Sequence, residues 1–162
     1  MNIISIKEKV FSKIYEFFLK IYYKDRLNIK GKFLVRKGQY INIDINGKLY
    51  IGEGCFFNNN CSINCKSEII IGDNCLFGEN VKLYDHNHNF KDKNILVKNQ
   101  GYSLGKITIG NNCWIGSNVT ILKNVTVGNN VVIGANCLVY KSIPDNSIVK
   151  SEPQIIIEKL KG

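Results

Sequence analysis

The 162 residues are enough to bury one hydrophobic core, and no segment suggests a second globular unit. Two prolines, a hydrophobic content of 44% and the lack of a long polar tract leave little room for disorder. The net charge of +9 is not accompanied by the rows of base-stacking aromatic residues that nucleic-acid platforms carry, so it suits a polyphosphate-bearing cofactor or an anionic glycan better than a nucleic acid.

The first predicted element is an amphipathic helix within residues 1–24. Charges interrupt it too often for a membrane-spanning helix, and no small-residue cleavage site follows it as in a signal peptide. An uncovered end of a β-coil would expose unpaired strand edges, so we expect the helix to pack on the first turn of a coil or on a neighbouring subunit. Contact of residues 3–23 with a membrane surface is the alternative. The predicted apolar side consists of Ile6, Val10, Ile14, Phe17, Phe18 and Ile21, with Lys7, Lys9, Lys13 and Lys20 on the other side.

Residues 25–150 contain a six-residue repeat. A period of six fits neither a helix, at 3.6, nor a single strand, at 2, so it predicts a β-solenoid whose three sides are each one hexad long. The repeating apolar residues are Ile45, Ile51, Phe57 and Ile63, then Ile71, Phe77 and Leu83, and then Ile109, Ile115, Ile121, Val127, Ile133 and Val139.

Each hexad has the same internal order of residue types. Glycine commonly follows the apolar residue, and asparagine follows two positions later, at 74, 80, 112, 118, 130 and 136, where a corner needs a residue that tolerates positive φ. The fifth position is small, apolar and predicted to point inward.

Most of the cysteines occupy that inward fifth position. This predicts packing for Cys55, Cys61, Cys75, Cys113 and Cys137. Only Cys65 lies out of phase, and no CxxC pair suggests a metal site. Free buried thiols favour a reducing cytoplasm.

The repeat resembles that of the hexapeptide-repeat acyltransferases. The segments IGDNCLFGENVKL and ITIGNNCWIGSNVTILKNVTVGNNVVIGANCLVYKSIP carry the resemblance, which covers residues 45–150. It implies an all-β fold, a left-handed parallel β-helix of triangular section, here with a short N-terminal helix, a protruding loop at 85–106 and a C-terminal tail at 151–162.

The phase of the repeat is lost between Leu83 and Ile109, in a stretch too long for a corner, which must therefore project from the coil. It opens with Asp85, His86, Asn87 and His88, which include the only two histidines of the chain. An imidazole can remove a hydroxyl proton near neutral pH, and Asp85 could hold its tautomer. The alternative is that both histidines are solvated loop residues.

The sugar O-acetyltransferases of this family, among them the maltose, galactoside, capsule and O-antigen enzymes, are similar at this loop. The resemblance implies a histidine general base, direct transfer from acetyl-CoA and homotrimers with clefts between neighbouring coils. The DHxH stretch of the polysaccharide-modifying members favours His86, whereas an ungapped count against the galactoside enzymes favours His88. We predict His86 and keep His88 as the alternative.

The same resemblance suggests cofactor-binding positions. Trp114 stands where the family places a tryptophan beside the active site, Ser117 and Ala135 match positions that hold the pantetheine arm, and Lys141 matches a lysine that could neutralise a CoA phosphate. Beyond them, Ile155 replaces a position that is cationic in the family, and the oxyanion donors are unassigned, with Gly116 and Ser117 as candidates.

Together these features predict an acetyl-CoA-dependent O-acetyltransferase that acts on a sugar in surface-polysaccharide synthesis. Its predicted location is the cytoplasm, with the inner face of the membrane as the alternative. An N-acetyltransferase for an amino sugar is a close variant. A β-helical metal enzyme, which needs three histidine ligands, and a non-catalytic solenoid are the distant alternatives, and no metal is expected. A covalent acyl-cysteine route competes with direct attack, but cysteines that face the core are poor nucleophiles.

Overall fold

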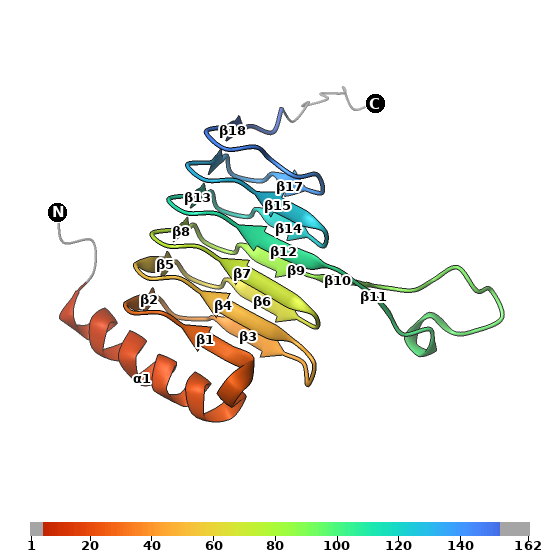
Figure 1. The fold of residues 1–162 in the computed structure, drawn as a ribbon, viewed down its shortest axis with the longest axis horizontal. Helices are drawn as coiled ribbons and strands as arrows, with labels where there is room; N and C mark the ends of the chain where they lie inside the picture. Colours follow the sequence, from red (N-terminus) through yellow and green to blue (C-terminus); the bar gives the residue numbers. More distant parts are fainter. Residues whose placement is uncertain (1–4, 153–162) are drawn as a thin grey trace, which may run out of the picture.

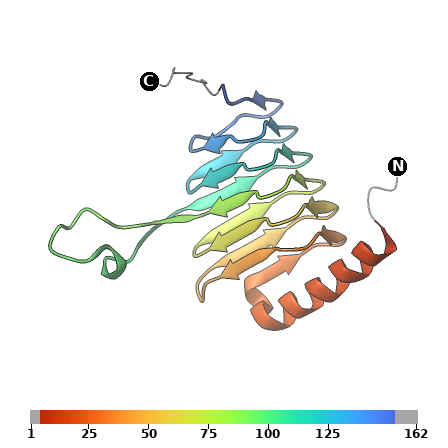
Figure 2. The same cartoon turned by 180° about the vertical axis from the view of Figure 1, so that it is seen from behind.

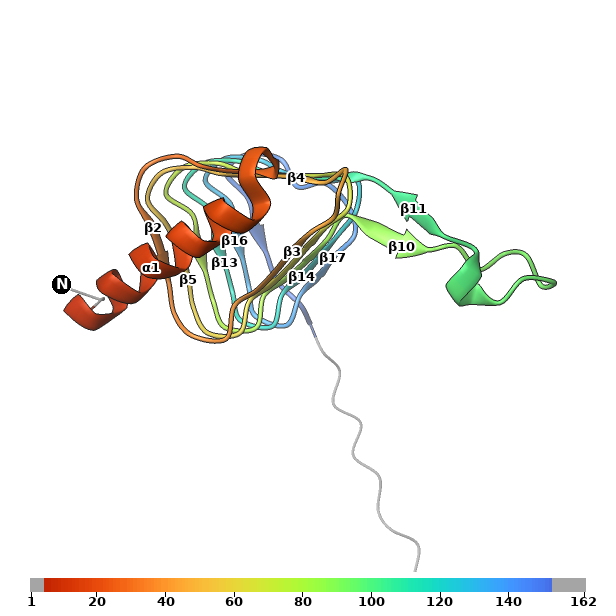
Figure 3. The same cartoon turned by 90° about the horizontal axis from the view of Figure 1, so that it is seen from below.

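The computed structural model describes residues 5–152, and within them the predicted fold class is confirmed. The chain winds into a three-sided parallel β-coil, with one helix across its first turn and an arm that projects from its middle (Figure 1 and Figure 2). Seen from the helix end, the chain runs counterclockwise as it recedes, so the coil is left-handed (Figure 3). Left-handed winding is an exception to the usual right-handed crossover of parallel strands.

Three parallel sheets form the sides of the coil. Sheet A contains β1 (Leu27–Ile29), β4 (Lys48–Ile51), β7 (Glu68–Ile71), β12 (Lys106–Ile109) and β15 (Val125–Val127). Sheet B contains β2 (Phe33–Val35), β5 (Cys55–Phe57), β8 (Leu76–Phe77), β13 (Trp114–Ile115), β16 (Val132–Ile133) and β18 (Ile148–Val149). Sheet C contains β3 (Tyr40–Ile43), β6 (Ser62–Cys65), β9 (Lys82–Tyr84), β14 (Thr120–Leu122) and β17 (Leu138–Val139).

The remaining elements are α1, two short helices and the strands of the arm. They are α1 (Ile6–Tyr23), η1 (Lys24–Arg26), β10 (His86–His88), η2 (Val97–Asn99) and β11 (Tyr102–Leu104).

The core is a set of columns in which equivalent residues of successive turns stack. Leu49, Ile69, Ile107 and Val125 form one such column in sheet A, each at most 1% exposed. In sheet B the rings of Phe57 and Phe77 stack with their centroids 4.2 Å apart. Each strand alternates inward and outward residues, so the core needs only one or two apolar side chains per strand.

One predicted core position is wrong. Ile45 is 79% exposed, and Ile43 is buried in its place, because the corner at residues 44–47 is a turn in which the Gly47 amide donates to the Asp44 carbonyl. Ile43 lies beneath Cys65 in the register of β3 and β6, which explains why Cys65 is buried although it is out of phase. The other five cysteines are also buried and unpaired, as predicted.

The asparagines at the corners adopt the predicted left-handed conformation. At the six predicted positions φ lies between 54° and 61°, and Asn60, Asn124 and Asn146 repeat this conformation at other corners. Several of these side chains form ladders between turns, as in the hydrogen bond of 2.8 Å from Asn80 Nδ2 to Asn118 Oδ1. Asparagine tolerates this backbone better than most residues because its short amide bonds locally.

Helix α1 covers the first turn, as expected, and it does so through the face opposite to the predicted apolar side. Ser12, Leu19 and Tyr23 are buried against the coil, whereas the predicted apolar side is exposed. The end of a β-coil presents unpaired backbone groups, and the buried face of α1 supplies partners for them. Ser12 Oγ accepts a hydrogen bond of 2.9 Å from the Val35 amide, and the Tyr23 hydroxyl donates one of 2.6 Å to the Ile41 carbonyl.

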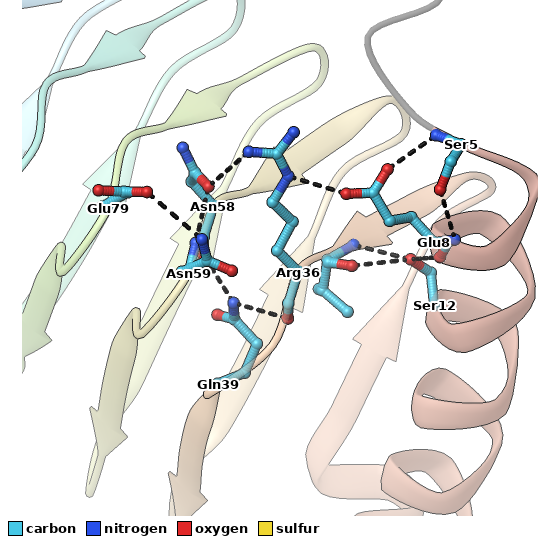
Figure 4. Close-up of polar contacts among 9 residues, drawn as sticks. Ser5, Glu8, Ser12, Arg36, Gln39, Asn58, Asn59 and Glu79 are labelled. Carbon is cyan, nitrogen blue, oxygen red and sulfur yellow. Dashed lines mark hydrogen bonds and ion pairs between the residues drawn. The ribbon is translucent and has the colours of Figure 1, made fainter.

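The start of α1 is fixed to the coil by a chain of polar contacts (Figure 4). Ser5 and Glu8 form a capping box, in which the Ser5 amide donates to Glu8 Oε2 and the Glu8 amide donates to Ser5 Oγ. Glu8 Oε1 also pairs with Arg36 Nε at 3.0 Å, and Arg36 Nη1 donates to Asn58 Oδ1. The Glu8 carboxylate therefore bonds both the first turn of α1 and the coil.

Candidate active site

The predicted catalytic residues lie at the base of the arm, where sheet C gives way to sheet A. The arm leaves the coil after β9 and returns at β12, and its two strands pair antiparallel with His86 opposite Leu104 and His88 opposite Tyr102. The Gly105 amide donates to the Asp85 carbonyl at 2.8 Å and closes the base. His86 is therefore held at the coil, while His88 lies two residue pairs further out along the arm.

Asp85 is fully buried and bonded by both carboxylate oxygens. Oδ1 accepts from the Lys66 amide at 2.9 Å, and Oδ2 accepts from the Ser67 amide at 2.7 Å. Oδ1 also lies 2.9 Å from His86 Nδ1. A carboxylate can only accept, so these contacts assign the proton to Nδ1 and leave Nε2 of His86 as the basic nitrogen.

His86 and His88 have different surroundings. The side chain of His86 is 14% exposed and meets the ring of Tyr102 edge-on, with 5.3 Å between centroids. The ring of His88 lies tilted on Tyr102 at 4.6 Å, and the residue is exposed. Only His86 has a carboxylate that fixes its tautomer.

Lys66 and Tyr102 complete the surroundings of His86, and the sequence did not predict either. Lys66 Nζ lies 2.6 Å from Asp44 Oδ2 and 4.1 Å from the centroid of the Tyr102 ring. The hydrogen bond between Lys66 and Asp44 raises the pKa of Lys66 and lowers the pKa of Asp44, so both side chains are charged near neutral pH. The signal that could have identified Lys66 is its place directly after Cys65, where the hexad phase first slips.

A cavity of about 500 Å³ lies along the arm. Its lining includes His88, Phe90, Lys91, Gln100, Ser103 and Lys123. Lys123 Nζ contacts Ser103 Oγ, which ties the arm to the next turn of the coil. An aromatic ring with amide, hydroxyl and ammonium groups is a lining that suits a polyhydroxylated ligand.

The predicted cofactor residues are not gathered around His86 within one chain. Trp114, 56% exposed, lies on the outer side of sheet B, and the arm leaves the coil on the opposite side (Figure 3). Ser117 and Ala135 follow β13 and β16 at the corner between sheets B and C. Only Lys141, after β17, lies at the corner between sheets C and A from which the arm departs.

An apolar column runs along the outer side of sheet B through Trp114. Its members share one register across all six strands of the sheet and are Leu34, Phe56, Leu76, Trp114, Val132 and Ile148. Leu76, Trp114 and Ile148 are 48%, 56% and 69% exposed. We call this set the sheet B column.

All six cysteines are buried. Every cysteine is at most 4% exposed, and burial raises the pKa of Cys61 to about 11 and that of Cys65 to about 12. Within residues 5–152, no three histidine, cysteine, aspartate or glutamate side chains lie together in a way that could hold a metal ion.

Two sequence profiles match the coil. The profile for bacterial transferase hexapeptide, with six repeats, matches residues 106–141. The profile for the hexapeptide repeat of succinyl-transferase matches residues 68–82. Both matches fall on the repeats that form the sheets.

Known proteins resemble the chain in sequence and fold. A galactoside acetyltransferase in complex with coenzyme A is 32% identical, with a TM-score of 0.65, over 88% of this chain and 75% of that one. A maltose O-acetyltransferase from Clostridium difficile 630 is 26% identical, with a TM-score of 0.71, over 97% and 88% of the two chains. A proposed acetyltransferase of Saccharomyces cerevisiae is 33% identical over 117 residues, 72% of this chain. The chain spans three fifths or less of the length of the curated relatives named among its matches, from 33% to 60%, and 59% for the yeast protein.

Proposed function

Because the chain belongs to the hexapeptide-repeat acyltransferase family, we propose that it transfers an acetyl group from acetyl-CoA to a hydroxyl group of a sugar. The observation that carries this proposal is the pair formed by the buried Asp85 and the partly buried His86 at the base of the arm. Asp85 holds one tautomer of the imidazole, which is what a general base requires.

In the proposed reaction His86 Nε2 accepts the hydroxyl proton while the sugar oxygen attacks the thioester carbonyl carbon. The new C–O bond forms an oxyanion, which collapses with cleavage of the C–S bond. The proton on Nε2 then passes to the CoA sulfur, so that the products are the acetyl ester and CoA thiol. Asp85 stabilises the imidazolium between these steps, and the low exposure of the cysteines disfavours an acyl-enzyme.

We propose a homotrimer as the active form. Trp114 and His86 lie on different sides of one coil, so one site could use both only if a neighbouring subunit brought its sheet B to the arm. The exposed sheet B column gives this neighbour an apolar surface to pack on. Trp114, Ser117 and Ala135 of one subunit would then hold the pantetheine arm beside His86 of the next, and Lys141 would meet a CoA phosphate.

For the acceptor we propose a sugar of a surface polysaccharide, modified in the cytoplasm. The galactoside and maltose acetyltransferases support the sugar class, and the six free thiols support a reducing compartment. Acetylation of an amino group on a sugar uses the same base and is the second candidate, because a sugar amine can occupy the place of the hydroxyl.

Release of CoA thiol, measured with acetyl-CoA and a panel of acceptors, tests this function. The panel contains neutral sugars, amino sugars, and nucleotide-linked and lipid-linked glycans. We expect acceptor-dependent thiol release together with an acetyl ester that mild base removes. A base-stable acetamide would support the amino-sugar variant instead, and no release with any acceptor would contradict the proposal.

A further inference from the structure

The outward side of α1 carries an apolar surface that nothing in the described chain covers. At 100° per residue, Val10, Phe17 and Ile21 point away from Leu19, which is buried against the coil. We define the outer face of α1 as the side chains that are 52% to 79% exposed on this side: Ile6, Val10, Ile14, Phe17, Phe18, Ile21 and Tyr22. Apolar surfaces of this kind usually mark an interaction site.

The outer face is open to a flat surface. Viewed from below, α1 lies across the end of the coil, in front of the three sheets (Figure 3). Because the outer face is opposite to the buried Leu19, it points away from the coil. The arm leaves the coil several turns higher and does not stand in front of the helix (Figure 1). A plane can therefore meet the whole length of α1.

The charges on α1 make its solvent-facing side basic. Lys9, Lys13 and Lys20 fall on one flank of the outer face, and Lys7 lies within it. Both acidic residues of the helix are already paired. Glu8 bonds Arg36 and the helix start, and Glu16 lies 2.6 Å from Lys20. The helix thus presents apolar groups together with Lys7, Lys9 and Lys13, which pair with neither acidic residue of the helix.

A cavity of about 310 Å³ opens beside the first turns of α1. It is lined by Lys7, Glu8, Phe11, Arg36, Lys37 and Asn59. Because Glu8 is engaged by Arg36 at 3.0 Å, the charges of Lys7 and Lys37 are left to attract an anion (Figure 4 shows the Glu8 contacts). Phe11 links the cavity to the outer face, since it lies at the edge of that face on the same helix.

We propose that the outer face of α1 lies on an anionic lipid surface. The apolar side chains enter the boundary between headgroups and acyl chains, the lysines of the flank meet lipid phosphates, and the cavity beside Phe11 receives an anionic headgroup. In the described residues no helix is long and apolar enough to cross a bilayer, so α1 would lie in the interface. A second copy of this face is a poorer occupant, because it would bring the lysines of two helices together. This inference is independent of the catalytic assignment.

Flotation of the full chain with lipid vesicles tests whether the outer face of α1 binds an anionic lipid surface. The protein should float with mixed phosphatidylcholine and phosphatidylglycerol vesicles and bind phosphatidylcholine vesicles far more weakly. The double variant Phe17→Ser/Ile21→Ser should lose about tenfold or more in bound fraction, because it removes two exposed apolar side chains that enter the lipid in the proposed complex. The pair Lys9→Gln/Lys13→Gln should lose about tenfold on the anionic vesicles only.

Leu138→Ser is the matched control, since Leu138 is 58% exposed on β17, at the opposite edge of sheet C from the first-turn strand β3, and its binding should equal that of the wild type. Thermal melting verifies that each variant is folded. If Phe17→Ser/Ile21→Ser does not fold, the flotation of Lys9→Gln/Lys13→Gln tests the lipid contact instead. Failure of the wild type to float with anionic vesicles would overturn the inference. So would unchanged flotation of both variants, or a changed oligomeric mass of the apolar variant without a change in flotation.

Discussion

Asp85 lies in a column of the coil that otherwise holds apolar side chains. The register of sheet C places it above Cys65, which itself lies above Ile43. The carboxylate is stable there because the Lys66 and Ser67 amides and the His86 ring all donate to it. The sequence could indicate Asp85 and His86 through the break in the repeat, but not Lys66 or Tyr102, whose roles depend on the stacking of distant turns.

Replacement of the buried carboxylate by Asp85→Asn should lower both activity and stability. The amide presents an N–H group where an acceptor is needed, so we expect a loss of about 1–3 kcal/mol in the free energy of unfolding. The thiol-release kcat should fall by about tenfold or more, because the tautomer of His86 is no longer fixed. Urea unfolding and initial rates measure the two effects.

Asp73→Asn is the matched control for this change. Asp73 also accepts a backbone hydrogen bond, from the Glu53 amide at 2.8 Å, but at a corner between sheets A and B. It should therefore leave kcat unchanged. Wild-type activity in Asp85→Asn would contradict the role of Asp85 in positioning His86.

The Asp44 and Lys66 pair should give stability a measurable dependence on pH. Pairing with Lys66 lowers the pKa of Asp44 in the folded protein below its ordinary value of 3.8. The contribution of Asp44 to the free energy of unfolding is therefore fully present above pH 3.8 and is lost as the pH falls through the lowered pKa. The pairing also raises the pKa of Lys66 above 10.5, so the contribution of Lys66 to the free energy of unfolding is fully present below pH 10.5. Asp44→Asn should therefore destabilise by about 0.2–1 kcal/mol at neutral pH, since Asp44 is partly exposed.

The measurement is urea unfolding of the wild type and Asp44→Asn across the acidic range. The difference between their free energies of unfolding should be constant near neutrality and shrink toward zero in strong acid. A difference that does not depend on pH would mean that charge pairing is not its source.

At the scale of elements, α1 shows where sequence periodicity is informative and where it is insufficient. The helical spacing of apolar residues correctly predicted a helix over the first turn, but the side that packs on the coil is opposite to the apolar one. A hydrophobic pattern identifies an apolar face without saying what covers it. The end of a β-coil requires hydrogen-bonding partners, so Ser12 and Tyr23 pack there and the apolar face remains free.

Ser12→Ala tests this explanation of how α1 is attached. The variant leaves the Val35 amide of the first sheet B strand without its partner, in a site where Ser12 is 1% exposed. We expect a loss of about 1–3 kcal/mol in urea unfolding. Lys13→Ala, at the exposed neighbouring position, should change the free energy of unfolding by less than about 0.5 kcal/mol. Equal stability of Ser12→Ala and Lys13→Ala would show that the hydrogen bond does not hold the helix.

At the scale of the whole molecule, the repeat predicted the coil and the arm, but its phase slips between residues 63 and 71 and is lost between 83 and 109, which obscures the side on which distant hexads lie. The six-residue period assigns consecutive hexads to different sheets, so Trp114 and His86 are carried to separate sides although both lie near one break in the sequence. A site that uses both residues must then be completed by another subunit. This requirement follows from topology and could not be read from residue spacing alone.

Leu76→Asp tests the proposed assembly. Leu76 is 48% exposed in the middle of the sheet B column, and a charge there should disrupt an apolar interface while leaving the coil folded. Light scattering should give a trimer mass for the wild type and a smaller mass for the variant, and the variant should lose most of its activity. Ile45→Asp, at an exposed isoleucine outside the sheet B column, is the control. A monomeric wild type with full activity would contradict the shared site.

The central claim is that His86, held by Asp85, is the general base. It is tested most directly by the rate of CoA thiol release in His86→Ala beside that in His88→Ala, at saturating acetyl-CoA and acceptor and with the oligomeric mass verified. We expect His86→Ala to lose about 10²-fold or more in kcat with the assembly intact, and His88→Ala to retain most of the wild-type rate. Normal turnover by His86→Ala, or a loss confined to His88→Ala, would contradict the assignment.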